Sequence, residues 1–212
     1  MITLHTWCTP NGRKISIMLE ETALPYVVKT VDINAGEQFL RENLRISPNN
    51  KIPAIVDDQA QGGSLAIFES GAILIYLAET SGQLLAPAGR ARYQALEWLH
   101  WSIGGLGPML GQLMFFALRS QEKAPLAIAR FTGEADRLLG VLEARLTQAP
   151  FLGGDDYSIA DIAVYPWALT ATVALGEVLA VSLRSKPSLH HWLKKLGRRP
   201  AVARGMNIPE DV

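Results

Sequence analysis

The sequence has little cysteine and no excess of charge, and both shortages limit what the protein can be. Its 212 residues include one cysteine, Cys8. An internal disulfide framework is therefore impossible, and a single thiol fits a reducing compartment. Twenty basic residues balance twenty acidic ones, so net charge favours neither nucleic acid nor a membrane surface as a partner. Residues 1–7 lack the basic and apolar regions of a secretory signal. We therefore expect a cytoplasmic protein.

Motifs for metals, phosphates and nucleic acids are also missing. The four histidines have no metal-ligand spacing with the cysteine, and no Gly-rich phosphate loop is present. The one basic cluster, residues 194–199, could indicate nucleic acid, but cations are also favoured at a helix C-terminus. The helix interpretation suits a neutral chain better. We expect no metal and no nucleic-acid partner.

One uncharged segment, Trp101 to Leu118, is about long enough to cross a bilayer. It contains four glycines and Pro108, and no second segment of this kind follows. We expect a buried helix with a broken middle and no membrane partner.

Residues 1–80 have the pattern of a small α/β domain. The expected elements, in order, are strand Ile2–His5, helix Arg13–Ala23, strand Tyr26–Val31, a short helix Gln38–Leu44, strands Ala54–Asp57 and Leu65–Phe68, and an apolar helix from about Glu69 to Thr80. A strand, a helix and a strand in succession predict a parallel crossover. The Gly62-Gly63 turn predicts an antiparallel hairpin.

The pattern changes at a Ser/Gly/Pro-rich linker, residues 81–89, after which no strand-like alternation remains. Residues 90–212 are expected to form an all-helical domain. Its expected helices are 90–118, 126–146, Ile159 to about Leu175, interrupted or kinked at Pro166, and a last one from Ser188 to about Leu196. Ser158 and Asp161 have the spacing of a capping box, with Asp in place of Glu or Gln.

The turn from Thr6 to Gly12 joins the first strand to the first helix and contains Cys8. Unpaired N–H groups and the positive end of the helix dipole meet there, and both stabilise a thiolate. Pro10 suits a first helical turn because its missing N–H would have no partner. We interpret this turn as a site for sulfur chemistry.

Three spaced blocks, Thr9–Gly12, Ile46–Ala54 and Phe68–Ile73, resemble the nu class of bacterial and fungal glutathione transferases. With the Ser158–Asp161 motif, the resemblance covers nearly the whole chain. It implies a thioredoxin-like α/β domain that binds glutathione as co-substrate. It also implies an all-α domain that contributes the acceptor-substrate site.

The resemblance implies that Thr9 and Asn11 face the glutathione sulfur, where a hydroxyl and a carboxamide can donate hydrogen bonds to a thiolate. The alternative for Asn11 is a plain helix N-cap. Ile52-Pro53 matches a cis-proline turn whose outward backbone groups can pair with an extended peptide. The alternative there is an ordinary trans loop.

Glu69 and Ser70 match residues that hold the γ-glutamyl ammonium and carboxylate. Their alternative role is a helix cap with an acid favoured by the dipole. Gln38 and Lys51 match contacts to the backbone and glycine end of glutathione. Arg130 matches an arginine that reaches a glutathione carboxylate, or it belongs to a solvated helix face.

An apolar acceptor wall is expected on the first helices of the second domain, unless these residues are ordinary core. Its candidates are Met109, Leu113, Met114, Phe115 and Phe116. The 90–118 helix is apolar on more than one face, which indicates a two-fold homodimer.

Cys8 departs from the nu-class pattern, which commonly has no cysteine at this position. Trp7–Asn11 also resembles the Trp-Cys-Gly-Pro-Cys of thioredoxins, with Asn11 in place of the second cysteine. Either Cys8 attacks a disulfide and free glutathione resolves the mixed disulfide, or bound glutathione attacks and Cys8 does not react. The expected activity is glutathione-dependent disulfide reduction, with conjugation and peroxide reduction as weaker activities. A non-catalytic glutathione-binding regulator is the alternative.

Overall fold

A four-stranded mixed sheet with helices on both faces forms the first of two units in the structure, a computed structural model that describes residues 1–210. This unit comprises Met1–Pro87 and the described residues from Arg198 onward. The second unit, Ala88–Gly197, is helical. The fold class expected from the sequence, an α/β domain followed by helices, is confirmed.

The sheet has the strand order β2-β1-β3-β4. Its strands are β1 (Ile2–Thr6), β2 (Tyr26–Thr30), β3 (Ala54–Asp57) and β4 (Leu65–Phe68). β1 is parallel to β2 and antiparallel to β3, and β3 is antiparallel to β4. The predicted crossover and the predicted hairpin are therefore both present.

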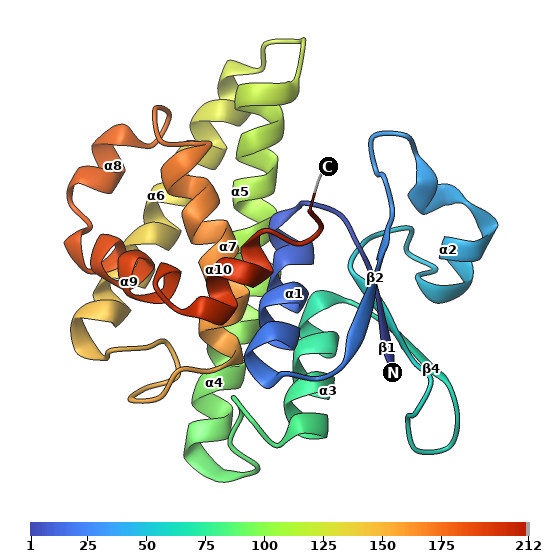
Figure 1. The fold of residues 1–212 in the computed structure, drawn as a ribbon. Coiled ribbons are helices and arrows are strands. Elements are labelled where there is room, and N and C mark those ends of the chain that lie inside the picture. The colour runs from blue at the N-terminus through green and yellow to red at the C-terminus, as the bar shows by residue number, and fades with distance from the viewer. Residues whose placement is uncertain (211–212) are drawn as a thin grey trace. The chain divides into compact units, whose positions relative to one another are not determined.

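Helices α1 (Pro10–Thr22) and α3 (Ser70–Ser81) cover one face of this sheet, and α2 (Arg41–Ile46) lies on the other, after the short 3-10 helix η1 (Glu37–Phe39) (Figure 1). The core between the sheet and its covering helices contains large apolar side chains. It includes Leu4, Ile15, Leu19, Ile55 and Leu74, none of which has exposed surface. Burial of such side chains stabilises each by about 1.5–3 kcal/mol.

The end of the chain adds a helix that the sequence patterns did not predict, α10 (Pro200–Met206), which packs on α1. Ser16 Oγ donates to the Gly205 carbonyl at 2.6 Å. A Cβ at Gly205 would lie 2.5 Å from Ile17 Cα, so only glycine permits this approach. Arg199 pairs with Glu21 through two hydrogen bonds. The sequence patterns assign this segment to the helical domain, whereas in the structure it packs on α1 and belongs to the unit that contains the sheet.

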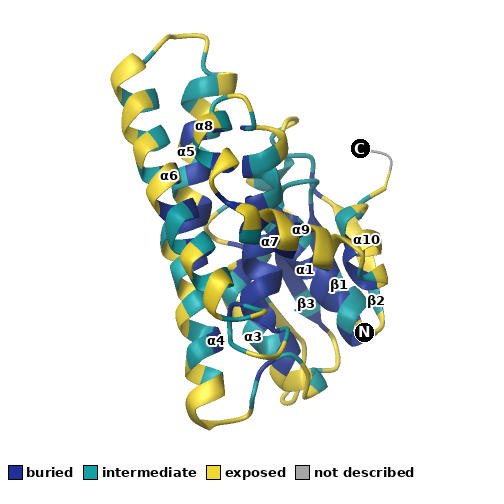
Figure 2. Cartoon of the chain, turned by 90° about the vertical axis from the view of Figure 1, so that its left-hand side faces the viewer, coloured by how far each residue is buried: buried dark blue, intermediate teal, exposed yellow. Residues whose placement is uncertain are grey.

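The helical unit contains α4 (Gly89–Trp101), the π-helical turn η2 (Ser102–Leu106), α5 (Gly107–Met114), a second π-helical turn η3 (Phe115–Arg119), α6 (Pro125–Gln148), α7 (Ile159–Val173), α8 (Ala180–Arg184) and α9 (Pro187–Gly197). α7 is the most buried of these, and Figure 2 shows it in dark blue. Because it packs against α4, α5 and α9, its sequence is apolar on all sides. Pro166 lies inside α7 without ending it.

The predicted capping box begins α7. Ser158 Oγ accepts from the Ala160 N–H, and Asp161 Oδ2 accepts from the Ser158 N–H at 3.1 Å. Asp161 Oδ1 also accepts from the Leu152 N–H and from Trp192 Nε1, each at 3.0 Å. One buried carboxylate therefore holds the start of α7, the preceding loop and α9 together.

The expected break in the 90–118 helix is wrong. Residues Gly89–Arg119 form one continuous helix with two π-helical turns, the first of which contains Gly104 and Gly105. It is also less buried than expected, since 28% of its most apolar stretch is buried. Within residues 1–210 it is the one helix long and apolar enough to cross a membrane. Helices of soluble proteins that bury one face against a partner have the same composition.

We predict that Asp161→Ala lowers the free energy of unfolding by about 3 kcal/mol, because it leaves several buried N–H donors without an acceptor. Urea denaturation followed by circular dichroism measures this change. Asp155→Ala, at an exposed position in the preceding loop, is the matched control and should shift stability by less than about 0.5 kcal/mol. Equal effects of the two substitutions would contradict the central role of Asp161.

Candidate functional site

Strand register brings four separate segments to one edge of the sheet. His5 of β1 lies opposite Ala54 of β3, and Ala54 lies opposite Phe68 of β4. The residues just outside these positions are the β1–α1 turn, the loop ending at Pro53, and the start of α3. β2 ends at the same edge, where the Val31 N–H donates to the Thr6 carbonyl at 2.9 Å. All the predicted ligand residues of the first unit belong to these four segments or to η1, which follows β2.

The β1–α1 turn presents the first N–H groups of α1. Thr9 is the N-cap, and its Oγ1 accepts from the Gly12 N–H at 3.2 Å. Asn11 lies inside the first turn, after Pro10, so the interpretation of Asn11 as the N-cap is wrong. Because the Thr9 oxygen accepts the cap bond, its hydroxyl proton remains available to donate. Cys8, partly exposed, directly precedes this cap.

Gly12 fixes the shape of this turn. A Cβ at Gly12 would lie 2.4 Å from both Thr6 Oγ1 and the Trp7 carbonyl oxygen. Any side chain there would push the helix start away from the strand. The small residue therefore sets how closely the α1 N-terminus approaches the sheet edge.

The start of α3 is the second helix N-terminus at this edge. Its N-cap is Glu69, whose backbone is in an uncommon conformation with φ 71° and ψ 115°, and no side chain caps the helix. Strained backbone of this kind is found mainly at ligand sites. Ser70, the first helical residue, is buried, while Glu69 is exposed. Uncapped N–H groups at a helix start are suited to bind a carboxylate.

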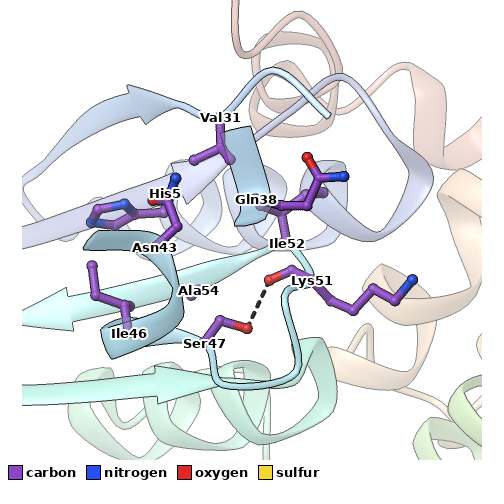
Figure 3. A pocket seen from close by; sticks show the side chains of 9 residues that line it. All are labelled: His5, Val31, Gln38, Asn43, Ile46, Ser47, Lys51, Ile52 and Ala54. Atoms are coloured by element: carbon purple, nitrogen blue, oxygen red, sulfur yellow. Dashed lines mark hydrogen bonds between the residues drawn. The ribbon is translucent and has the colours of Figure 1, made fainter. Parts of the chain in front are cut away.

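The loop before β3 contains the predicted proline turn, and its Ile52–Pro53 peptide bond is cis. Ser47 Oγ donates to the Lys51 carbonyl at 2.8 Å and braces the loop. Residues of this loop line a small cavity of about 10 Å³, whose lining side chains are drawn in Figure 3. The cavity is lined by His5, Val31, Gln38, Asn43, Ile46, Ser47, Lys51, Ile52 and Ala54. It brings three predicted ligand residues, Gln38, Lys51 and Ile52, around one point.

Two buried polar residues on this cavity were missed by the sequence analysis. His5 and Asn43 are 5% and 8% exposed, and their Nδ1 and Oδ1 atoms have no hydrogen-bond partner among the described residues. Asn43 Nδ2 donates to the Glu37 carbonyl at 2.7 Å. Burial lowers the pKa of His5 below 6.5, and Lys29 acts in the same direction. A single polar residue in a strand, such as His5, or in a short helix, such as Asn43, gives no sequence signal for a buried position at a site.

The helical unit holds the remaining predicted residues. Arg130 is exposed on α6. Of the expected apolar wall, Leu113 has no exposed surface and belongs to the core, while Phe115 is 50% exposed. The ring of Phe116 stacks on Phe131 at 5.8 Å. Of the candidates, Leu113 is therefore an ordinary core residue. Phe115 and Phe116 belong to an accessible aromatic cluster on η3 and α6.

No group of three or more His, Cys, Asp or Glu side chains within residues 1–210 is arranged to hold a metal ion. The chemistry available at the sheet edge is that of two helix N-termini, the Thr9 hydroxyl, and the Asn11 carboxamide. Such a site is suited to bind an anionic peptide and a thiolate.

Comparison with known proteins assigns this arrangement to a family. Residues 1–79 match the family model of the glutathione S-transferase N-terminal domain, and residues 125–195 match that of the C-terminal domain. The chain belongs to the glutathione transferase family. It is 47% identical over 208 residues to the disulfide-bond oxidoreductase YfcG of Escherichia coli, which covers 97% of this chain and 94% of that protein.

Solved structures of relatives have the same fold. A glutathione transferase family member from Pseudomonas fluorescens, with two glutathione bound, has a TM-score of 0.94 and 45% identity, covering 98% of this chain and 93% of that one. A glutathione transferase from Pseudomonas putida, with one glutathione disulfide bound per subunit, also has a TM-score of 0.94, with 41% identity over 98% of this chain and 91% of that one.

We predict that stability falls in mild acid because of His5. The folded protein favours neutral His5, whereas the unfolded chain binds a proton as the pH drops below about 6.5. Stability should therefore decrease as pH falls through this value, until His5 also titrates in the folded state. His5→Asn should lessen this decrease in unfolding experiments between about pH 7 and pH 5. Exposed His100→Asn is the control, and an unchanged pH profile in His5→Asn would contradict the assignment.

Proposed function

We propose that this protein is a glutathione-dependent disulfide-bond reductase. The observation that carries the proposal is the convergence of the α1 and α3 N-termini and the Ile52–Pro53 loop at one edge of the sheet. The combination offers a place for a thiolate, a place for an α-carboxylate and an open backbone segment between them. Glutathione is an anionic peptide that has a group for each place: a thiol, an α-carboxylate and a peptide backbone.

In the proposed binding mode, the γ-glutamyl carboxylate accepts from Ser70 and the first N–H groups of α3, and Glu69 pairs with the neighbouring ammonium. The Ile52 backbone, before Pro53, pairs with the cysteinyl part of the ligand. Gln38 and Lys51, which line the cavity in Figure 3, contact the rest of the peptide and its glycine carboxylate. Arg130 is proposed as a further carboxylate-binding residue.

The proposed reaction is thiol–disulfide exchange. Thr9 Oγ1–H and Asn11 Nδ2–H donate to the sulfur of bound glutathione and favour its thiolate. The thiolate attacks one sulfur of the substrate disulfide, forms a mixed disulfide and releases the other sulfur as a thiolate. A second glutathione thiolate attacks the glutathionyl sulfur of that mixed disulfide. Glutathione disulfide forms and the second substrate thiolate leaves, so the substrate gains two electrons.

The names of two relatives and the ligand bound in a third support this reaction. YfcG and YghU of Escherichia coli, the latter 40% identical over 215 residues, are both named disulfide-bond oxidoreductases. The Pseudomonas putida structure holds glutathione disulfide, which is the oxidised product of the proposed cycle. We propose the same reaction for this chain, in the cytoplasm, with a small disulfide as the acceptor.

The homodimer is proposed from the surface of the long helix Gly89–Arg119. Among its apolar residues, Tyr93, Phe115 and Leu118 are 70%, 50% and 51% exposed. Surfaces of this composition are commonly buried by a second copy. Sedimentation equilibrium should give twice the chain mass of 23.1 kDa. A monomer at micromolar concentration would contradict this proposal.

The reductase proposal is tested by turnover. Purified protein with glutathione and a small dialkyl disulfide should form glutathione disulfide well above the uncatalysed rate. A hydroperoxide and an aryl halide are parallel substrates, for which weaker rates are expected. Thr9→Val should lower kcat/KM about tenfold or more, because it removes a hydrogen bond to the thiolate. Cys8→Ser should leave the disulfide rate unchanged if bound glutathione is the nucleophile.

The other outcomes of this experiment are equally specific. Loss of disulfide reduction in Cys8→Ser, with Thr9→Val little affected, would make Cys8 the nucleophile. Glutathione binding without turnover on all three substrates would instead indicate a glutathione-binding regulatory protein. Thr9→Ser, which keeps the hydroxyl, is the matched control and should retain most of the activity.

A further inference from the structure

A buried lysine lies one turn inside the helix that begins at the proposed thiolate site. Lys14 is 1% exposed and is among the largest fully buried side chains of the protein. Within its own unit, the described residues form no hydrogen bond or ion pair with its ammonium group. Lysines are almost never fully buried without a partner, because desolvation of the charge is costly. A cost of this size requires a compensating role.

Helix geometry indicates where this ammonium group lies. Lys14 follows Pro10 by four residues and Asn11 by three, so the three side chains share one face of α1. Side chains of a helix point back toward its N-terminus. The long Lys14 side chain therefore extends beneath the first turn of α1, toward the turn that carries Thr9.

An electrostatic interaction with Glu69 agrees with this position. Its carboxylate acts on Lys14 and raises the pKa of the ammonium group, while burial lowers that pKa more strongly, to about 7. Glu69 precedes α3 at the same sheet edge as the α1 N-terminus. The charge of Lys14 thus interacts with a carboxylate at the start of α3.

Other charged or titratable groups on α1 and on the elements packed against it are placed or paired differently. Arg13 neighbours Lys14 on α1. The remaining ones are His5 on β1, Tyr76 and Glu79 on α3, and the pairs Arg199–Glu21 and Arg204–Glu20 at the other end of α1. Of the charged groups among the described residues, Glu69 is the one whose charge shifts the pKa of Lys14.

We propose that the Lys14 ammonium, held beneath the first turn of α1, stabilises the glutathione thiolate bound at that turn. Lys14 does not touch the sulfur and is an electrostatic positioning residue rather than a catalytic one. The inference rests on the proposed function, because it assumes that glutathione binds at this edge. It adds a fixed cationic side chain to the helix dipole and the Thr9 hydroxyl as a third source of thiolate stabilisation.

Glutathione binding should change the protonation of two groups, the ligand thiol and Lys14. Free glutathione carries its thiol proton near neutral pH, and the thiol loses this proton to solvent when it becomes a bound thiolate. The negative sulfur in turn favours the protonated form of Lys14, which takes up a proton. Binding should therefore release less than one proton in total.

The test measures the thiol pKa of bound glutathione from its ultraviolet thiolate absorbance. Lys14→Met should raise this pKa by about one, which lowers the thiolate fraction about tenfold below both pKa values. Lys14→Arg, which keeps the charge, should largely preserve the wild-type value. Lys29→Met, at an exposed lysine of β2, is the charge-matched control and should have no effect.

A second ligand separates electrostatics from structure. S-methylglutathione has no ionisable thiol, so its affinity should be the same in wild type and Lys14→Met. Loss of this affinity in the variant would show that Lys14 merely holds Glu69 or the fold in place, and would overturn the proposal. Methionine suits the buried position, since apolar replacements of buried charges are often neutral or stabilising.

Calorimetry tests the same idea through proton release. Glutathione binding is measured in two buffers of different ionisation enthalpy, and the difference gives the protons released. At a pH where the bound thiol is ionised in both proteins, proton uptake by Lys14 should make wild type release fewer protons than Lys14→Met. Equal release at that pH would overturn the proposal. A wild-type protein that binds no glutathione would instead overturn the proposed function, so the two failures are distinguishable.

Discussion

The structure depends on the register of β1, β3 and β4. The pairing of His5 with Ala54, and of Ala54 with Phe68, places the turn before α1, the cis-proline loop and the start of α3 at one edge. A slip of one residue in β3 would turn the buried Ile55 toward the other face of the sheet. The apolar core thus enforces the register, and the register assembles the ligand-binding edge. Packing and binding are consequences of the same alignment.

At that edge the protein supplies electrostatic stabilisation of negative charge. Two helices begin there, one with a hydroxyl at its N-cap and one with no side-chain cap. Both features favour negative charge, the first on a sulfur and the second on a carboxylate. A site of this kind allows the ligand to bring the nucleophile. If bound glutathione is the nucleophile, the proposed reaction requires no reactive side chain from the protein, Cys8 included.

The sequence predicted the fold and most of the candidate edge because the relevant signals are local. Pro10, the Ile52-Pro53 pair and Glu69-Ser70 are short motifs next to strands or helix starts. The missed features depend on distant neighbours. Lys14 has the pattern of a solvent-facing helix residue, and only the packed structure shows its burial. Nothing near Gly205 indicates that it packs on Ile17. The glycines at 104–107 suggested a break, but the helix continues through them, with Gly104 and Gly105 in a π-helical turn.

The packing of α10 on α1 has a consequence for synthesis. α1 leaves the ribosome early, whereas Gly205 and Arg199, which hold it through Ser16 and Glu21, are made only after the whole helical unit, Ala88–Gly197. During synthesis the sheet unit therefore cannot complete its packing when its first segment, Met1–Pro87, has emerged. One face of α1 stays uncovered by α10 while the helical unit is being made.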